Sequence, residues 1–424
     1  MVKADSDKYK NMLKEVRKLC EKLNDIIDDD IVIRILTKCQ ESVIVIGESL
    51  EKIERANEKE VLKKLQTVNK LEQLCELLYQ YSQKMERNIR KEIIRIIDNI
   101  ICDIDTIPRT YRVTFLPYKA AMWDSLESIW REFAASDECE TSVVPIPYFE
   151  ANRKTNQWDT CYEGNKYPDY VPVVNFQDYL LGQKRPDLVF VHNPFDQFNN
   201  VTTVHPAYYS AELKKSCEKL VYVPYYVNPG FISDDYNELP LLYRSDYIIV
   251  QSEKAKETCK DFPYYNRVLA LGSPKFDKVV NLYNEKVAPP EEWNINLDGK
   301  KCILLNTTLT DFLESGELLM NKLYKMFEIA LDRNDIVIVW RPHPLLKGTV
   351  KAMRPQYIEK YDELVQYFID NKVGVYDTTA DVSRAVAVSD AYVGSHYSSI
   401  IALFEVINKP IFRIDSKKLL DRNS

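Results

Sequence analysis

An arginine and a histidine follow a predicted buried strand and alternate with two prolines, as Arg341-Pro342-His343-Pro344. The prolines stop further strand pairing and fix the turn, so both polar side chains keep their directions. A guanidinium can bind two phosphate oxygens, and an imidazole can transfer a proton near neutral pH. We interpret Arg341 as a donor-binding residue and His343 as a catalytic residue. A structural turn with a hydrogen-bonded histidine is the alternative.

A second candidate segment is rich in hydroxyl groups and follows the predicted strand 391–394. Backbone N–H groups at the start of the next helix, with Ser398 and Ser399 beside them, would form a seat for an anion. The same serines could instead be plain helix caps. Glu405, further along that helix, is placed to accept hydrogen bonds from a ribose, and a solvent-facing carboxylate is its alternative.

Two shorter segments add polar groups at predicted strand ends. Gly272 and Pro274 frame a tight turn that would present Ser273 and Lys275 to a donor. Thr307 and Thr308 end the predicted strand 301–306. Hydroxyls at such a strand end can lie beneath phosphates, and a polar turn is the alternative.

The region before residue 285 has its own polar strand ends, which we interpret as an acceptor face. His192 ends the predicted strand 188–192, and His205 comes 13 residues later; these two histidines are candidate catalytic bases. Loop capping is the alternative for each polar residue in this region. The candidate acceptor-binding residues are Asn193, Asp196, Tyr225, Tyr226 and Asn228.

The elements that must position these residues begin at residue 108. All 20 prolines lie at or after Pro108, and Gly47 is the one glycine before it. Apolar residues in 1–107 recur at helical spacing, so we predict an all-α module of three or four helices. We expect this bundle or coiled-coil-like module to mediate homo-oligomer assembly, with membrane docking through its isoleucine-rich last helix as the weaker alternative.

From residue 108 onward, short apolar strands alternate with helices. This pattern predicts parallel sheets covered on both faces, in two doubly wound α/β domains facing a cleft. Ligands of such sheets bind outside the carboxyl ends of the strands. We place the acceptor domain at 108–285 and the nucleotide-donor domain at 286–424. The predicted strands are 112–116, 142–146, 188–192, 220–224, 247–251, 267–271, 301–306, 335–341, 373–376, 391–394 and 410–414.

Composition excludes several classes of protein. The net charge of −7 argues against a nucleic-acid-binding surface, and no apolar run is long enough to span a bilayer. Nine cysteines without a C-x-x-C pair indicate reduced thiols in the cytoplasm. Dinucleotide-binding, P-loop, metal-protease and hydrolase-elbow motifs are all absent from the sequence.

The segments GSPKFD, RPHP and SDAYVGSHYSSIIALFEVINKPIF resemble the CDP-glycerol glycerophosphotransferase family of teichoic-acid type. The resemblance covers about residues 265–415, is looser over 110–264, and omits 1–107. It implies a GT-B fold, two Rossmann-like domains with the nucleotide held mainly by the second. The family's R-x-H-P maps onto Arg341, His343 and Pro344, and its G-x-P-x-x-D onto Gly272, Pro274 and Asp277. Its pyrophosphate-contacting D-Y-S-S maps onto Ser395, His396, Tyr397, Ser398 and Ser399.

Two positions depart from the family pattern. Its His-Gly at an N-domain strand end, a candidate base, is replaced by Pro224-Tyr225-Tyr226. The aspartate of D-Y-S-S is replaced by Ser395-His396. A divergent member with an altered substrate is therefore expected.

The leading hypothesis is a metal-independent transferase in cell-wall biogenesis. It would move a glycerol-phosphate-like group from a CDP-linked donor to a glycan, polyol-phosphate or lipid-linked acceptor, without a separate cofactor. One alternative is a GT-B glycosyltransferase using a UDP- or GDP-sugar. Another is a non-catalytic nucleotide-fold scaffold that assembles through residues 1–107. The expected location is the cytoplasm, with the inner face of the cell membrane as a peripheral site.

Overall fold

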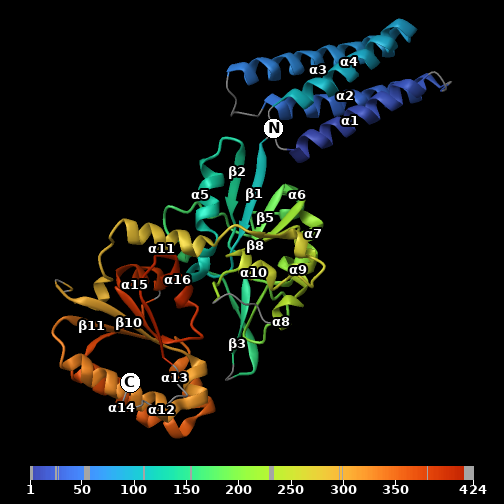
Figure 1. Cartoon of the computed structure of the whole chain (residues 1–424). Helices are drawn as coiled ribbons and strands as arrows, with labels where there is room; N and C mark the ends of the chain where they lie inside the picture. The colour runs from blue at the N-terminus through green and yellow to red at the C-terminus, as the bar shows by residue number, and fades with distance from the viewer. Residues whose placement is uncertain are drawn as a thin grey trace.

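The structure is a computed structural model of the 424-residue chain (Figure 1). It describes residues 3–23, 26, 28–51, 58–107, 110–152, 155–228, 234–295, 297, 299–379 and 381–414. Pro108, the predicted domain boundary, lies outside these residues. The domain bounds therefore stay a prediction.

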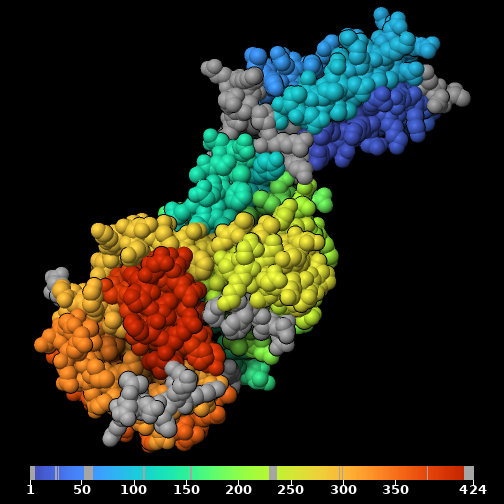
Figure 2. Space-filling model, viewed as in Figure 1, coloured from blue at the N-terminus to red at the C-terminus, as the bar shows by residue number. Residues whose placement is uncertain are grey.

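The N-terminal module is a bundle of four helices, as the helical spacing predicted. They are α1 (Lys3–Lys22), α2 (Asp29–Glu51), α3 (Glu58–Lys84) and α4 (Arg87–Thr106). Isoleucines three and four residues apart on α4 face the bundle core, where they are buried against the other helices. Docking of these isoleucines onto a membrane stays a prediction, and their burial does not favour it. Figure 2 shows the bundle (blue) projecting from the rest of the molecule.

The first α/β unit contains a six-stranded parallel sheet of order β2-β1-β5-β7-β8-β9. Apolar cores cover both faces of this sheet, as expected for buried parallel strands. Its strands are β1 (Tyr111–Leu116), β2 (Cys139–Val143), β5 (Leu188–Val191), β7 (Lys219–Tyr222), β8 (Tyr247–Val250) and β9 (Val268–Ala270). Its helices are α5 (Glu127–Ala135), α6 (Leu181–Lys184), α7 (Ser210–Ser216), α8 (Asp234–Asn237), α9 (Pro240–Arg244) and α10 (Glu253–Glu257), with the 3-10 turn η2 (Ala120–Ser125).

A small antiparallel sheet accompanies this unit and was not expected from the sequence. Its strands are β3 (Tyr148–Asn152), β4 (Gln157–Cys161) and β6 (Thr202–Val204), in the order β4-β3-β6. The β4 strand is mostly exposed, so it lacks the apolar run by which the other strands were predicted.

The second unit contains a five-stranded parallel sheet of order β12-β11-β10-β13-β14. Its strands are β10 (Lys301–Thr307), β11 (Ile336–Pro342), β12 (Gly374–Tyr376), β13 (Ala391–Ser395) and β14 (Ile411–Ile414). Two apolar cores again cover the two faces. Its helices are α12 (Leu309–Leu331), α13 (Leu346–Met353), α14 (Ile358–Asp370), α15 (Val382–Val388) and α16 (Ile400–Val406).

Helix α11 (Pro274–Asn284) joins the two units (Figure 1). Its Val279 is buried in a core of the second unit, and its Lys275 pairs with Asp124 on η2 of the first. Two parallel α/β sheets in tandem after a helical module form the predicted GT-B-like architecture, and this fold class is confirmed.

Candidate functional site

The carboxyl ends of three neighbouring strands form the centre of the candidate site. Strands β11, β10 and β13 lie side by side, and predicted site residues follow each of them. The backbone N–H of His343 donates to the Thr307 carbonyl at 2.9 Å. The hydroxyls of Thr308 and Ser395 lie 3.1 Å apart. The structure therefore brings together the predicted residues of three separate segments.

His343 is half-buried, and its imidazole has one nitrogen engaged. Nδ1 accepts a hydrogen bond from the Leu345 N–H at 3.2 Å, so the neutral ring carries its proton on Nε2. Burial lowers the pKa of His343 below its usual value, because desolvation disfavours the charged imidazolium. Nε2 makes no hydrogen bond to the part of the chain that the structure describes. This side chain can thus offer a hydrogen-bond donor near neutral pH.

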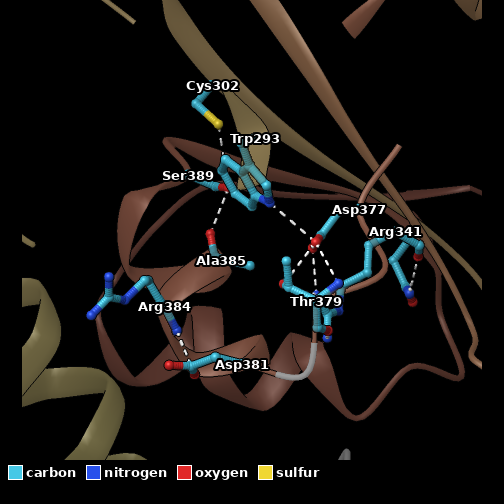
Figure 3. Close-up of polar contacts among 10 residues, drawn as sticks. Trp293, Cys302, Arg341, Asp377, Thr379, Asp381, Arg384, Ala385 and Ser389 are labelled. Carbon is cyan, nitrogen blue, oxygen red and sulfur yellow. Dashed lines mark hydrogen bonds and ion pairs between the residues drawn. The ribbon is translucent and has the colours of Figure 1, made fainter. Parts of the chain in front are cut away.

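Arg341 is buried and holds a loop of its own unit (Figure 3). Its guanidinium donates to the Asp377 carboxylate and, at 2.7 Å, to the Thr379 carbonyl. Asp377 also accepts from the Trp293 indole N–H at 3.1 Å and from the Thr379 hydroxyl at 2.7 Å. The predicted role of Arg341 as a phosphate ligand stays a prediction. The geometry favours a positioning role, since both terminal nitrogens are engaged.

The segment after β13 is organised by its own hydroxyls. Ser395 Oγ accepts from the Tyr397 N–H at 3.2 Å, and Ser398 Oγ accepts from the Ile400 N–H at 3.2 Å. The Ser398 bond to the first residue of α16 matches the capping alternative for that serine, whereas Ser399, the N-cap residue, makes no side-chain capping bond. His396 and Ser399 are exposed at this edge, where a donor could reach them.

Glu405 is exposed and pairs with Arg413 of β14 at 3.3 Å. This ion pair matches the solvent-facing alternative for the side chain. Ribose binding by Glu405 stays a prediction that the geometry does not favour.

The turn that follows β9, which contains Gly272 and Ser273, belongs to the first α/β unit. Gly272 has a φ of +99°, which glycine adopts readily, and it lines a small cavity with Ser273, Tyr226 and Asn228. Predicted donor-binding and acceptor-binding residues therefore meet in this cavity. Lys275 is directed elsewhere, because its Nζ contacts Asp124 Oδ1 at 2.7 Å.

His192 is fully buried between β1, η2 and β5. Its Nε2 accepts from the Tyr118 N–H at 3.1 Å, and its Nδ1 lies 2.8 Å from the Ser125 hydroxyl, which itself donates to the Met122 carbonyl. Burial, followed by the charge of Lys275, lowers the pKa of His192 to about 3. A base role for His192 stays a prediction, and the geometry opposes it because both nitrogens are engaged.

The other polar residues of this face divide into engaged and available groups. Asp196 is buried and accepts from the Ser210 N–H at 2.8 Å, and Asn228 exchanges two backbone hydrogen bonds with Gln251 at 2.8 Å. Asn193 Nδ2 is buried without a hydrogen-bond partner in the described structure. His205 is exposed, and its Nδ1 accepts from the Ala207 N–H at 3.3 Å.

Tyrosines gather beyond the end of β7. Tyr225 packs edge-to-face on His192, with ring centroids 6.2 Å apart, and on Tyr226 at 5.5 Å. Tyr226 also contacts Tyr236 at 5.3 Å. Burial raises the pKa of Tyr226 to about 12, so this phenol stays protonated at neutral pH. The cluster can donate hydrogen bonds to an acceptor, but it cannot replace a base.

Two site residues, Asp377 and Trp293, were not predicted from the sequence. Asp377 follows β12 directly, so it could have been predicted as a polar residue at the carboxyl end of a strand, as the other site residues were. Trp293 lies in a short 3-10 turn before the second sheet, and no local pattern connects it with Asp377.

The comparisons with known proteins agree with the resemblance drawn from the sequence. Residues 227–416 match the family model of CDP-Glycerol:Poly(glycerophosphate) glycerophosphotransferase. The resemblance to this family is confirmed for this part of the chain. This glycerophosphotransferase segment contains β8 to β14 and with them Arg341, His343 and Ser395. The expected class of enzyme, a glycerophosphotransferase-like transferase, agrees with this family.

Several solved structures overlap the chain at low identity. S. aureus MnaA with UDP is 14% identical, covering 71% of this chain and 78% of its own, with a TM-score of 0.43. The UDP-GlcNAc 2-epimerase of Methanocaldococcus jannaschii is 15% identical, with coverages of 71% and 82% and a TM-score of 0.43. The wall teichoic acid polymerase TagF is 16% identical, with coverages of 85% and 79% and a TM-score of 0.43. Among curated proteins the sequence has no match.

No helix in the described part of the chain has the length and apolarity to cross a bilayer.

Proposed function

We propose that the chain transfers a glycerol-phosphate-like group from a CDP-linked donor to a glycan, polyol-phosphate or lipid-linked acceptor in cell-surface polymer synthesis. The observation that carries the proposal is the position of His343. It lies at the carboxyl end of β11, and its backbone N–H donates to the Thr307 carbonyl at the end of β10, within the segment that matches the family.

The proposed reaction is an attack of an acceptor hydroxyl on the β-phosphorus of the donor. A new acceptor O–P bond forms, the bond from this phosphorus to the bridging oxygen breaks, and CMP leaves. His343 donates its Nε2 proton in a hydrogen bond to the departing phosphate, where negative charge develops. His396 and Ser399, which are exposed at this edge, bind other phosphate oxygens, whereas the Thr308 hydroxyl donates to Asp311 at 2.7 Å and lies beside Ser395. Arg341 acts indirectly, by holding the loop that begins at Asp377.

On the acceptor side, two groups remain available for binding or proton removal. The free Asn193 Nδ2 would bind an acceptor oxygen. His205 is the candidate base, because it is exposed and Nδ1 can take the acceptor proton once its 3.3 Å hydrogen bond from the Ala207 N–H is released, whereas His192 has both nitrogens engaged in the buried core.

The test measures CMP release from CDP-glycerol with a poly(glycerol phosphate) acceptor. His343→Ala is expected to lower kcat about 100-fold or more, the usual effect of losing a proton-handling group. His343→Gln should recover part of this loss, because its amide can still donate a hydrogen bond. Lys347→Ala, on the exposed face of the next helix, is the matched control and should keep full turnover. Full turnover by His343→Ala would refute the proposal.

A non-catalytic nucleotide-binding scaffold is the second candidate, and the internal pairing of His192 favours it. Thermal unfolding with CDP, UDP, GDP and CDP-glycerol separates the possibilities. Stabilisation by CDP-glycerol together with CMP release supports the transferase. Stabilisation without release indicates the scaffold, and preference for UDP or GDP indicates a glycosyltransferase.

A further inference from the structure

A groove of about 480 Å³ runs between α2 and α3 on the helical module. Val43, Val68 and Leu71, which belong to the bundle core, form its floor. At Gly47 an added Cβ would meet no atom within 4 Å, so the groove is open there. Because glycine has no side chain, the space between the two helices stays unfilled at this position.

The walls of the groove are apolar and remain in contact with water. Ile44 is 49% exposed and Tyr79 is 55% exposed, although both lie beside the buried core. Leaving such side chains exposed forgoes the free energy that their burial would release. Contiguous exposed apolar surface of this kind is typical of an interaction site.

The charges on the rim select among possible occupants. Four carboxylates lie along the groove, those of Glu48, Glu51, Glu72 and Glu76, and its lining contains no Lys or Arg among the described residues. An anionic lipid surface would be repelled by this rim. A second copy placed groove to groove would bring the same carboxylates face to face. A partner with basic flanks is the complementary occupant.

We propose that the α2–α3 groove binds an amphipathic helix of a partner protein, with apolar anchors flanked by lysine or arginine. Such a helix would place anchors spaced by three and four residues on the floor and its basic flanks against the four carboxylates. This site is on the module, outside the glycerophosphotransferase segment, and does not depend on the proposed reaction.

The test uses the full chain and two synthetic helical peptides of about 18 residues. Both carry the same leucine face; one has lysines on its flanks and the other has glutamates. Fluorescence anisotropy should show the lysine peptide binding at least about tenfold more tightly than the glutamate peptide. The preference should weaken at high salt, because exposed charges are screened.

Variants of the chain locate the binding. Gly47→Leu should abolish binding by filling the groove, and it should not unfold α2, since leucine is a better helix former than glycine. Glu48→Lys combined with Glu76→Lys leaves two carboxylates and two lysines on the rim and should remove the peptide preference. Glu41→Lys combined with Glu86→Lys makes the same charge change at exposed positions outside the groove and should leave the preference unchanged.

Three results would overturn the proposal. Equal binding of the two peptides would remove the charge argument, and unchanged binding by Gly47→Leu would place the site elsewhere. A full chain that sediments as a dimer, and as a monomer with Gly47→Leu, would show that a second copy occupies the groove.

Discussion

The histidines of this protein show how the surroundings of a side chain decide its chemistry. His192 and His343 both follow apolar parallel strands. His192 is enclosed by the first sheet and by η2, with both nitrogens hydrogen-bonded, whereas His343 is half-buried with one nitrogen engaged. The first histidine is therefore suited to hold three elements together, and the second to meet a ligand.

His192 should make stability depend on pH. In the folded chain the pKa of His192 is about 3, and in the unfolded chain it returns to its ordinary value of 6.5. Below pH 6.5 the His192 imidazole binds a proton in the unfolded state but stays neutral in the folded state until the pH approaches 3. The free energy of unfolding therefore falls as pH falls from 6.5 toward 3, and this contribution is complete above 6.5.

Urea unfolding followed by tryptophan fluorescence at about pH 7 and about pH 5 checks this expectation. His192→Gln should reduce the loss of stability at the lower pH, because glutamine does not titrate. His205→Gln, at an exposed position, should behave as the unchanged protein does. An identical pH dependence for His192→Gln would contradict the expectation.

At the scale of elements, the close approach of β10 and β13 shapes the donor edge. Gly394 has a φ of +155°, and a Cβ there would clash with the Asn306 carbonyl and lie 3.0 Å from the Tyr392 hydroxyl. The Tyr392 hydroxyl donates to the Ser395 carbonyl at 2.8 Å, directly beside the candidate site. One glycine thus permits both the strand pairing and the position of the following turn.

Gly394→Ala should destabilise the second unit by about 1–3 kcal/mol, because the neighbour it would strike is backbone. Gly348→Ala is the matched control. It lies on the exposed side of α13 with no atom within 4 Å of an added Cβ, and it should stabilise the helix by about 1 kcal/mol. Urea unfolding measures both changes. Equal stabilities of the two variants would refute the close-approach argument.

At the scale of the whole molecule, the chain has separate apolar cores in the bundle and in the two α/β units. The bundle core is formed by residues of the N-terminal module, from Tyr9 to Ile107, and the two units are joined through α11. Separate cores connected in this way favour more than one unfolding transition.

Nucleotide binding should therefore stabilise one part of the molecule selectively. All five tryptophans follow residue 107, so their fluorescence reports on the α/β units, whereas circular dichroism also reports on the bundle. CDP at a hundredfold excess over its Kd should stabilise the fluorescence transition by about 2.7 kcal/mol. The helical signal of the bundle should keep its midpoint. An equal shift of both signals would show that the molecule unfolds as one unit.

Much of this architecture was predictable, because its signals are local. Apolar runs predicted the strands of both parallel sheets, and the absence of proline before residue 108 predicted the helical module. The small antiparallel sheet was missed, since β4 is exposed and has no apolar run. The Arg341–Asp377 contact was not predicted, because its partners lie 36 residues apart in the chain. The residues around Arg341 do not indicate that Asp377 will be its neighbour in the fold.

The sequence by itself determined the alternation of strands and helices, the proline boundary and the family resemblance of the C-terminal segment, since each of these depends on residue type and spacing. Only the tertiary structure decided which polar strand ends are engaged internally. Arg341 meets Asp377, His192 meets Ser125, and His343 keeps one nitrogen available, because hydrogen bonding and desolvation depend on neighbours brought from distant parts of the chain.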